Sequence, residues 1–109
     1  MGFKIGLHTN GAFPSVLRRI VGLLDWVALD VKAPLSGEKY SALSGHNSSL
    51  GFVIQSLQIL LESNIEYEIH TTYDPSILNN SEIEKLSLEL HQLGVSSHKL
   101  QQMRSPSFL

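Results

Sequence analysis

The chain has 109 residues, with eight basic and ten acidic side chains, a formal net charge of −2 and no cysteine. This length predicts one domain over residues 1–109 and excludes a complete eight-stranded α/β barrel, which takes ~250 residues. The absence of thiols excludes disulfides, thiolate zinc sites, cysteine nucleophiles and cysteine-ligated iron–sulfur clusters within this chain. The charge offers no basis for binding nucleic acid or an anionic membrane. With no signal peptide and no apolar run that would span a bilayer, a soluble cytoplasmic protein is expected.

The first predicted unit is a strand followed by a turn and a helix. Residues 3–8 alternate apolar with small or polar side chains, which predicts a short strand, and the Asn-Gly pair at 10–11 is a strong turn signal. Pro14 suits the first turn of a helix, where a missing N–H costs little. Apolar residues then recur at helical spacing as far as Leu24, so a helix is expected over this stretch.

Residues 25–32 form the central predicted strand. The run from Trp26 to Leu29 is apolar without polar alternation, which is typical of a parallel strand covered on both faces. Asp30 and Lys32 follow at a spacing of two, so in an extended chain they point to the same side. A carboxylate and an ammonium at the carboxyl end of a parallel strand lie where α/β folds bind ligands, although a structural ion pair gives the same pattern.

The connection after this strand is long. Residues 33–49 separate it from the next apolar helix, whereas strand-to-helix connections usually take ~2–6 residues. A helical turn is expected over residues 38–43 within this connection. Long loops at this position often cover a site. The helix that follows is expected to end at residues 63–64.

Two more strands and a helix complete the predicted order. Residues 65–72 alternate in polarity and form the third strand. Ser81 and Glu84 have the spacing of a capping box, which predicts the start of the last helix, and Gly94 has the position of a C-cap glycine. Residues 95–103 form the fourth strand.

The predicted fold class is α/β, a partial (βα) barrel of about four parallel strands alternating with three helices. Three right-handed crossovers imply a parallel, curved sheet with helices on one side. The carboxyl ends of all four strands then lie at one rim, and polar residues at every end indicate a site there. The alternative is ordinary solvation, since strand ends in any α/β protein carry polar residues. The residues at these ends are His8, Thr9 and Asn10; Asp30 and Lys32; His70, Thr71 and Thr72; and Gln101, Gln102 and Arg104.

Four segments resemble successive strands of the radical SAM activating enzymes. They are Leu7-His8-Thr9-Asn10-Gly11, Asp25-Trp26-Val27-Ala28-Leu29-Asp30-Val31-Lys32-Ala33-Pro34, Tyr67-Glu68-Ile69-His70-Thr71-Thr72 and Leu100-Gln101-Gln102-Met103-Arg104. The subgroup they resemble activates anaerobic ribonucleoside-triphosphate reductase and is related to the pyruvate formate-lyase activating enzyme. The resemblance covers nearly the whole chain, in order. It implies a six-stranded partial barrel with S-adenosylmethionine and a four-iron four-sulfur cluster. In this family a 5′-deoxyadenosyl radical removes a hydrogen atom from a glycine of the partner reductase.

The resemblance also implies a cofactor-binding rim. Asp30 and Lys32 would lie near the methionine or ribose end of S-adenosylmethionine, and Arg104 would supply the last strand's polar contact. His70 stands where these enzymes commonly have arginine, and a neutral imidazole lacks arginine's bidentate fork. The implied cofactor-binding residues are Thr9, Asn10, Asp30, Lys32, His70, Thr72 and Arg104.

The chain departs from the family at the cluster site. The family's CxxxCxxC motif and its glycine-rich turn have no counterpart here and would lie upstream of Met1. The chain therefore resembles the carboxyl-terminal part of such an enzyme and is expected to be a split, frameshifted or truncated product. It would be inactive alone, and the cluster would be present only if another chain supplied the cysteines. Binding of S-adenosylmethionine by this chain is expected to be weak or absent, because the cluster and the upstream strands that hold part of the cofactor are missing. The expected partner is the reductase.

Two alternatives come from other functional classes. One is a non-catalytic interaction module that forms homo-oligomers through the open edge of residues 3–8 and through apolar residues on an uncovered concave face. The residues expected on that face are Val27, Leu29, Tyr67 and Ile69 or their neighbours along the strands. The other is a metal-dependent hydrolase with His8, Asp30 and His70 as ligands, although no short histidine spacing supports such a site.

Overall fold

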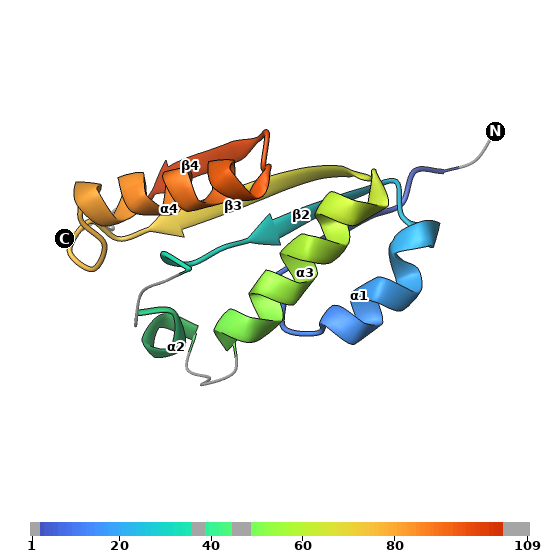
Figure 1. The fold of residues 1–109 in the computed structure, drawn as a ribbon, viewed down its shortest axis with the longest axis horizontal. Helices are drawn as coiled ribbons and strands as arrows, with labels where there is room; N and C mark the ends of the chain where they lie inside the picture. Colours follow the sequence, from blue (N-terminus) through green and yellow to red (C-terminus); the bar gives the residue numbers. More distant parts are fainter. Residues whose placement is uncertain (1–2, 36–38, 45–48, 104–109) are drawn as a thin grey trace, which may run out of the picture.

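The computed structural model of the chain describes residues 3–35, 39–44 and 49–103. Its four strands form one sheet in the order β1-β2-β3-β4, and each neighbouring pair is parallel. The strands are β1 (Gly6–Thr9), β2 (Trp26–Asp30), β3 (Glu66–Tyr73) and β4 (His98–Gln102). The helices are α1 (Pro14–Ile20), the 3₁₀ helix η1 (Val21–Leu23), α2 (Lys39–Ser44), α3 (Ser49–Ser63) and α4 (Asn80–Leu93). The predicted α/β class, with four parallel strands joined through the three crossover helices α1, α3 and α4, is confirmed (Figure 1).

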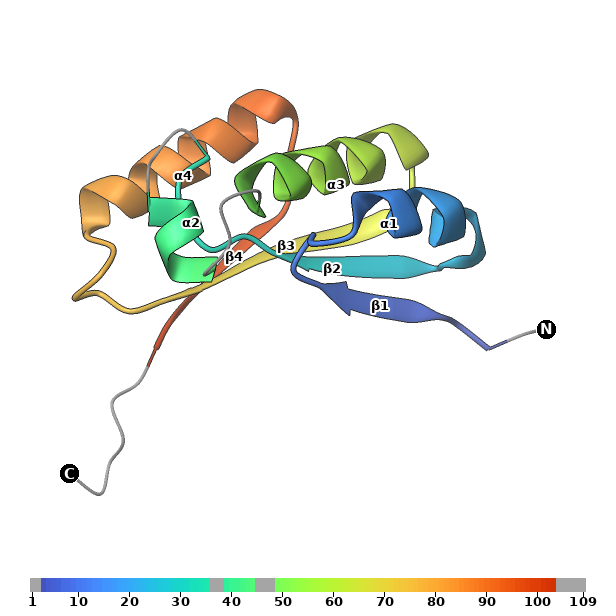
Figure 2. The ribbon, with the colours of Figure 1, turned by 90° about the horizontal axis from the view of Figure 1, so that it is seen from below.

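All the helices lie on one side of the sheet (Figure 2). Alternate residues of β2 point to this side, and Val27 and Leu29 there are completely buried. Ile69 of β3 is likewise buried under the helices. Tyr67, two residues before Ile69, is partly buried against the same core. The prediction that these four residues line an uncovered concave face is therefore wrong, because their parity along the strands directs them into the helix-covered core. Their neighbours along the strands, such as Trp26, lie on the other side of the sheet instead.

The other side of the sheet, here called the open face, carries mainly polar and charged side chains. In β2 it presents Trp26 and Asp30, and in β3 it presents Glu66, Glu68 and His70. No helix of the described part of the chain covers this side (Figure 2). The apolar core is therefore buried on one side of the sheet only, between the strands and the helices.

Helix α4 begins two residues earlier than the spacing of Ser81 and Glu84 predicts. The capping box is formed by Asn79, whose side-chain oxygen accepts from the Glu82 N–H at 2.9 Å, and by Glu82, whose Oε1 accepts from the Asn79 N–H at 3.2 Å. Ser81 already lies in the first turn, so Glu84, three residues later, is inside the helix, where its N–H has an intrahelical carbonyl partner and needs no cap. At the other end the predicted C-cap is confirmed, since Gly94 has a φ of 101° and its N–H bonds the last turn.

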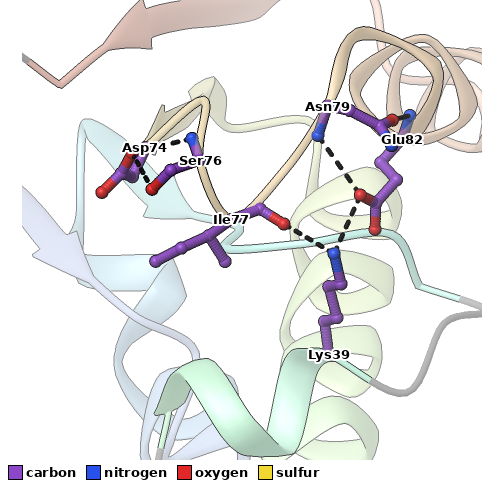
Figure 3. Close-up of polar contacts among 6 residues, drawn as sticks. All are labelled: Lys39, Asp74, Ser76, Ile77, Asn79 and Glu82. Atoms are coloured by element: carbon purple, nitrogen blue, oxygen red, sulfur yellow. Dashed lines mark hydrogen bonds and ion pairs between the residues drawn. The ribbon is translucent and has the colours of Figure 1, made fainter.

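The connection between β2 and α3 contains the short helix α2, as the predicted helical turn over 38–43 indicated. Tyr40 anchors it, because its side chain is buried and its hydroxyl accepts from the Lys32 N–H at 3.2 Å. Lys39 anchors it a second time by donating to the Ile77 carbonyl at 2.6 Å and to Glu82 Oε1 at 2.9 Å (Figure 3). Helix α2 is therefore fastened both to the end of β2 and to the start of α4.

None of the helices in the described ranges has the length and apolar character required to cross a bilayer.

Candidate functional site

The site begins with an ion pair at the carboxyl end of β2. Asp30 Oδ2 and Lys32 Nζ are 2.8 Å apart, and each side chain is about one third exposed. The predicted common orientation of the two side chains is confirmed. Because solvent reaches the pair, its contribution to stability is small, ~0–1 kcal/mol, and its polar groups remain accessible to a ligand.

The turn after β1 forms the second part of the rim. Thr9 Oγ1 accepts from the Gly11 N–H at 3.0 Å, and Asn10 Oδ1 accepts from the Ala12 N–H at 3.0 Å. Both side-chain oxygens therefore shape the turn. Gly11 has a φ of 77°, and a Cβ there would crowd Val53 of α3 at 3.0 Å, so glycine allows both the turn and the close helix contact.

His70 forms the third part and is oriented by a neighbour on its own strand. His70 lies opposite Asp30 in the sheet, and its Nε2 is 2.7 Å from Glu68 Oε2. The other oxygen of Glu68 accepts from Lys99 Nζ of β4 at 2.8 Å. Hydrogen bonds from Lys99 and, to a lesser extent, His70 hold the pKa of Glu68 below its usual range. The His70 imidazole therefore has a hydrogen-bond partner on its own strand. The Glu68 carboxylate, which lies between His70 and Lys99, is ionised at neutral pH.

The predicted residues divide between two adjoining cavities. The larger, here called the rim groove, has a volume of about 520 Å³ and the smaller a volume of about 220 Å³. The rim groove is lined by His8, Thr9, Asn10, Phe13, Ala28, Leu29, Asp30 and His70. The smaller cavity is lined by Asn10, Ala12, Phe13, Lys32, Tyr40, Ser49 and Phe52. The structure therefore brings Thr9, Asn10, Asp30 and His70 together around one groove and places Lys32 beside it.

Two of the predicted residues are not part of this arrangement. Thr72 is exposed further along β3 and lines neither cavity. Arg104 lies outside the described residues.

Sequence reasoning missed the aromatic side chains that border the site. Phe13, directly before α1, lines both cavities, and Tyr40 and Phe52 line the smaller one. Burial, reinforced by the nearby charge of Asp30 and opposed by the Lys32 N–H, raises the pKa of Tyr40 to about 12. Tyr40 therefore remains a neutral phenol at physiological pH. The only sequence signal was a tyrosine in the long connection, which does not by itself show where the ring packs.

The proposed metal triad is not assembled as a ligand set. His8, Asp30 and His70 do line the same groove. Nevertheless, no three His, Asp or Glu side chains within the described ranges are grouped so that they could hold a metal ion. That grouping, which the hydrolase alternative requires, is not observed there.

The chemistry available at this rim is that of ligand binding. A carboxylate accepts hydrogen bonds from hydroxyl or ammonium groups, an ammonium donates to an anion, and the aromatic rings offer a surface to a flat apolar group. The five residues that supply these functions are Asp30, Lys32, Phe13, Tyr40 and Phe52. Comparisons of the chain with protein-family models, with curated proteins and with solved structures find no match.

Proposed function

We propose that this chain is the carboxyl-terminal part of a radical SAM activating enzyme of the type that acts on anaerobic ribonucleoside-triphosphate reductase. Its sheet would be a segment of that family's partial barrel, and its rim would hold part of S-adenosylmethionine. One observation carries the proposal. Four residues that the resemblance implies as cofactor contacts line a single groove at the carboxyl ends of β1, β2 and β3.

The groups present at the rim fit this cofactor. Asp30 uses only Oδ2 to contact Lys32, so its carboxylate can still accept from ribose hydroxyls or from the methionine ammonium. Lys32 can donate to the methionine carboxylate, and Phe13 can contact a flat ring. The volume of the rim groove, about 520 Å³, lies within the range of ~300–1,000 Å³ usual for small-molecule sites.

The four-iron cluster does not fit this chain, because the sequence has no cysteine and such clusters are held by thiolates. In the family, the cluster reduces the bound cofactor to a 5′-deoxyadenosyl radical. The residues of this chain would only bind and orient the cofactor, while a second chain would supply the cluster. Anaerobic reconstitution of this chain alone with iron and sulfide is expected to leave it without a stoichiometric cluster.

The deciding experiment is a titration with S-adenosylmethionine followed by calorimetry or by ligand-observed NMR. We expect weak binding by the wild-type chain, with a Kd on the order of 1 mM, equivalent to about 4 kcal/mol. The double variant Asp30→Ala with Lys32→Ala should abolish it, whereas Thr72→Ala, outside both cavities, should not change it. No binding at millimolar concentration, or binding that survives the double variant, would contradict the proposal.

A second candidate, a self-associating interaction module, is favoured by the edge of β1. Phe3 is 99% exposed and Ile5 is 52% exposed, and β1 ends the sheet on this side. Residues of this size are seldom left in water beside an unpaired strand edge. Sedimentation equilibrium over a tenfold range of concentration should show association that Ile5→Lys abolishes. A single species of monomer mass throughout would rule this candidate out.

A further inference from the structure

The open face has a further cavity, distinct from the rim groove. It has a volume of about 730 Å³ and lies over the first half of β2 and β3. The side chains that matter for its chemistry are Trp26, His8, Glu66 and Glu68. Of these four, only His8 also borders the rim groove.

Trp26 is held in one orientation by its neighbours. A Cβ at Gly6 would overlap the indole atoms Cε2, Cζ2 and Nε1, so the ring lies directly against the backbone of β1. His8 stands edge-on to it, with ring centroids 5.0 Å apart and an interplanar angle of 82°. Trp26 is half-buried and lines the cavity. The fold therefore presents a fixed aromatic surface to whatever enters.

The sheet register places a carboxylate beside this ring. Trp26 pairs with Glu66, and Ala28 pairs with Glu68, so both carboxylates stand on the open face next to the indole. Glu68 is already engaged by Lys99 and His70. The carboxylate of Glu66 is exposed and makes no hydrogen bond or ion pair with any residue that the structure describes. The cavity thus holds one carboxylate that is not neutralised by a neighbouring cation.

A fixed indole and an unpaired carboxylate together select a positively charged organic group. The face of an indole attracts cations within ~6 Å of its centroid, and the carboxylate adds charge attraction and a hydrogen-bond acceptor. The same carboxylate repels phosphates and other anions. We propose that this cavity binds an organic cation, either a guanidinium or an alkylammonium group, against Trp26 and Glu66.

The test uses the intrinsic fluorescence of Trp26, which is the only tryptophan in the chain. Butylguanidinium is titrated at constant ionic strength, with butylurea as the neutral probe of the same shape. We expect a saturable fluorescence change with butylguanidinium only. Because exposed charge interactions are worth up to ~1 kcal/mol, Glu66→Gln should weaken binding by about fivefold.

The matched control is Glu84→Gln, which removes an exposed carboxylate on α4, on the opposite side of the sheet. It should leave the affinity for butylguanidinium unchanged, and so should the double variant at Asp30 and Lys32. The proposal is overturned if butylurea produces the same change, or if Glu66→Gln and Glu84→Gln bind butylguanidinium equally well. Urea unfolding of Glu66→Gln verifies that the variant is folded. The result is independent of whether S-adenosylmethionine binds at the rim groove.

A second arm identifies the source of the cation. A blocked Gly-Arg-Gly peptide is compared with butylguanidinium in the same titration. Tighter binding of the peptide assigns the cavity to a basic side chain of a polypeptide, and equal binding assigns it to a small free amine or guanidine. Both results support the cation site, whereas binding of neither probe excludes it.

Discussion

The side chains on the two faces of the four-stranded sheet have different roles, although they come from the same strands. On the helix-covered face, Val27 and Leu29 are completely buried and contribute to the hydrophobic core. On the open face, one residue away along β2, Trp26 is half-buried and Asp30 is ion-paired with Lys32. Because side chains alternate along a strand, one residue packs in the core and stabilises the fold, while its neighbour faces the other side and is available to a ligand. Substitutions on the first face should therefore affect folding, and those on the second should affect ligands.

The largest change in stability that tests this comparison is expected for Leu29→Ala. Leu29 is completely buried between the sheet and the helices, so loss of its side chain leaves a cavity and should cost about 2–5 kcal/mol of unfolding free energy. Thr72→Ala, on the exposed face, should change stability by less than about 0.5 kcal/mol. Urea unfolding followed by circular dichroism measures both. Similar losses for the two variants would show that the faces do not differ as described.

A glycine pair tests the packing of the open face. Gly6→Ala would drive a methyl group into the Trp26 indole and should cost about 1–2 kcal/mol, with a shift of the tryptophan emission. Gly22→Ala in η1 meets no atom within 4 Å and should be neutral or stabilising by up to about 1 kcal/mol. Adding Trp26→Ala to Gly6→Ala should remove the overlap. A Gly6→Ala variant with unchanged emission would mean that the indole does not lie on β1.

A smaller effect is expected where α4 begins to cover the sheet. Asn79→Ala removes one half of the capping box and should cost about 1 kcal/mol. Ser81→Ala should change stability by less than about 0.5 kcal/mol, because Ser81 lies inside the first turn. Thermal unfolding of the two variants gives the comparison. The reverse order of effects would support the capping box predicted from Ser81 and Glu84.

The smallest effect concerns pH at the junction of β3, β4 and α4. His98 Nε2 is 2.8 Å from Thr71 Oγ1, and Nδ1 is 3.4 Å from Ser87 Oγ. Burial, with a minor effect of the charge of His70, lowers the pKa of His98 below its ordinary value of 6.5. The unfolded chain therefore binds a proton first as the pH falls below 6.5, and stability should decrease on acidification until the folded pKa is passed.

The measurement is the unfolding free energy at several values between about pH 7 and pH 5, where histidine titrates. Carboxylates with lowered pKa values, such as Glu68 and Glu82, lose their contribution at lower pH, below their ordinary value of 4.5. His98→Gln should make the dependence flatter, since the amide carries no titratable proton in this range. An identical slope in the variant and the wild-type chain would remove His98 as its cause.

Local patterns in the sequence were sufficient to predict much of the fold. The order of strands and helices, the common side of Asp30 and Lys32 and the C-cap at Gly94 all depend on residues close together in the chain, where the helical period, the strand period and glycine's left-handed φ act directly. Glu68 and His70 have the same spacing of two and were open to the same reasoning.

Tertiary structure alone decided which face is covered and what borders the rim. The right-handed crossovers predicted helices on one side of the sheet, but the apolar run over 26–29 did not show which of its residues face them. Only the folded structure placed Val27 and Leu29 in the helix-covered core. The contacts of Glu68 with Lys99 and of Thr71 with His98 depend on the register of β3 and β4. Burial of Tyr40 beside Lys32 depends on how the long connection folds back. Contacts between residues distant in sequence are set by packing of the whole chain, which no local period encodes.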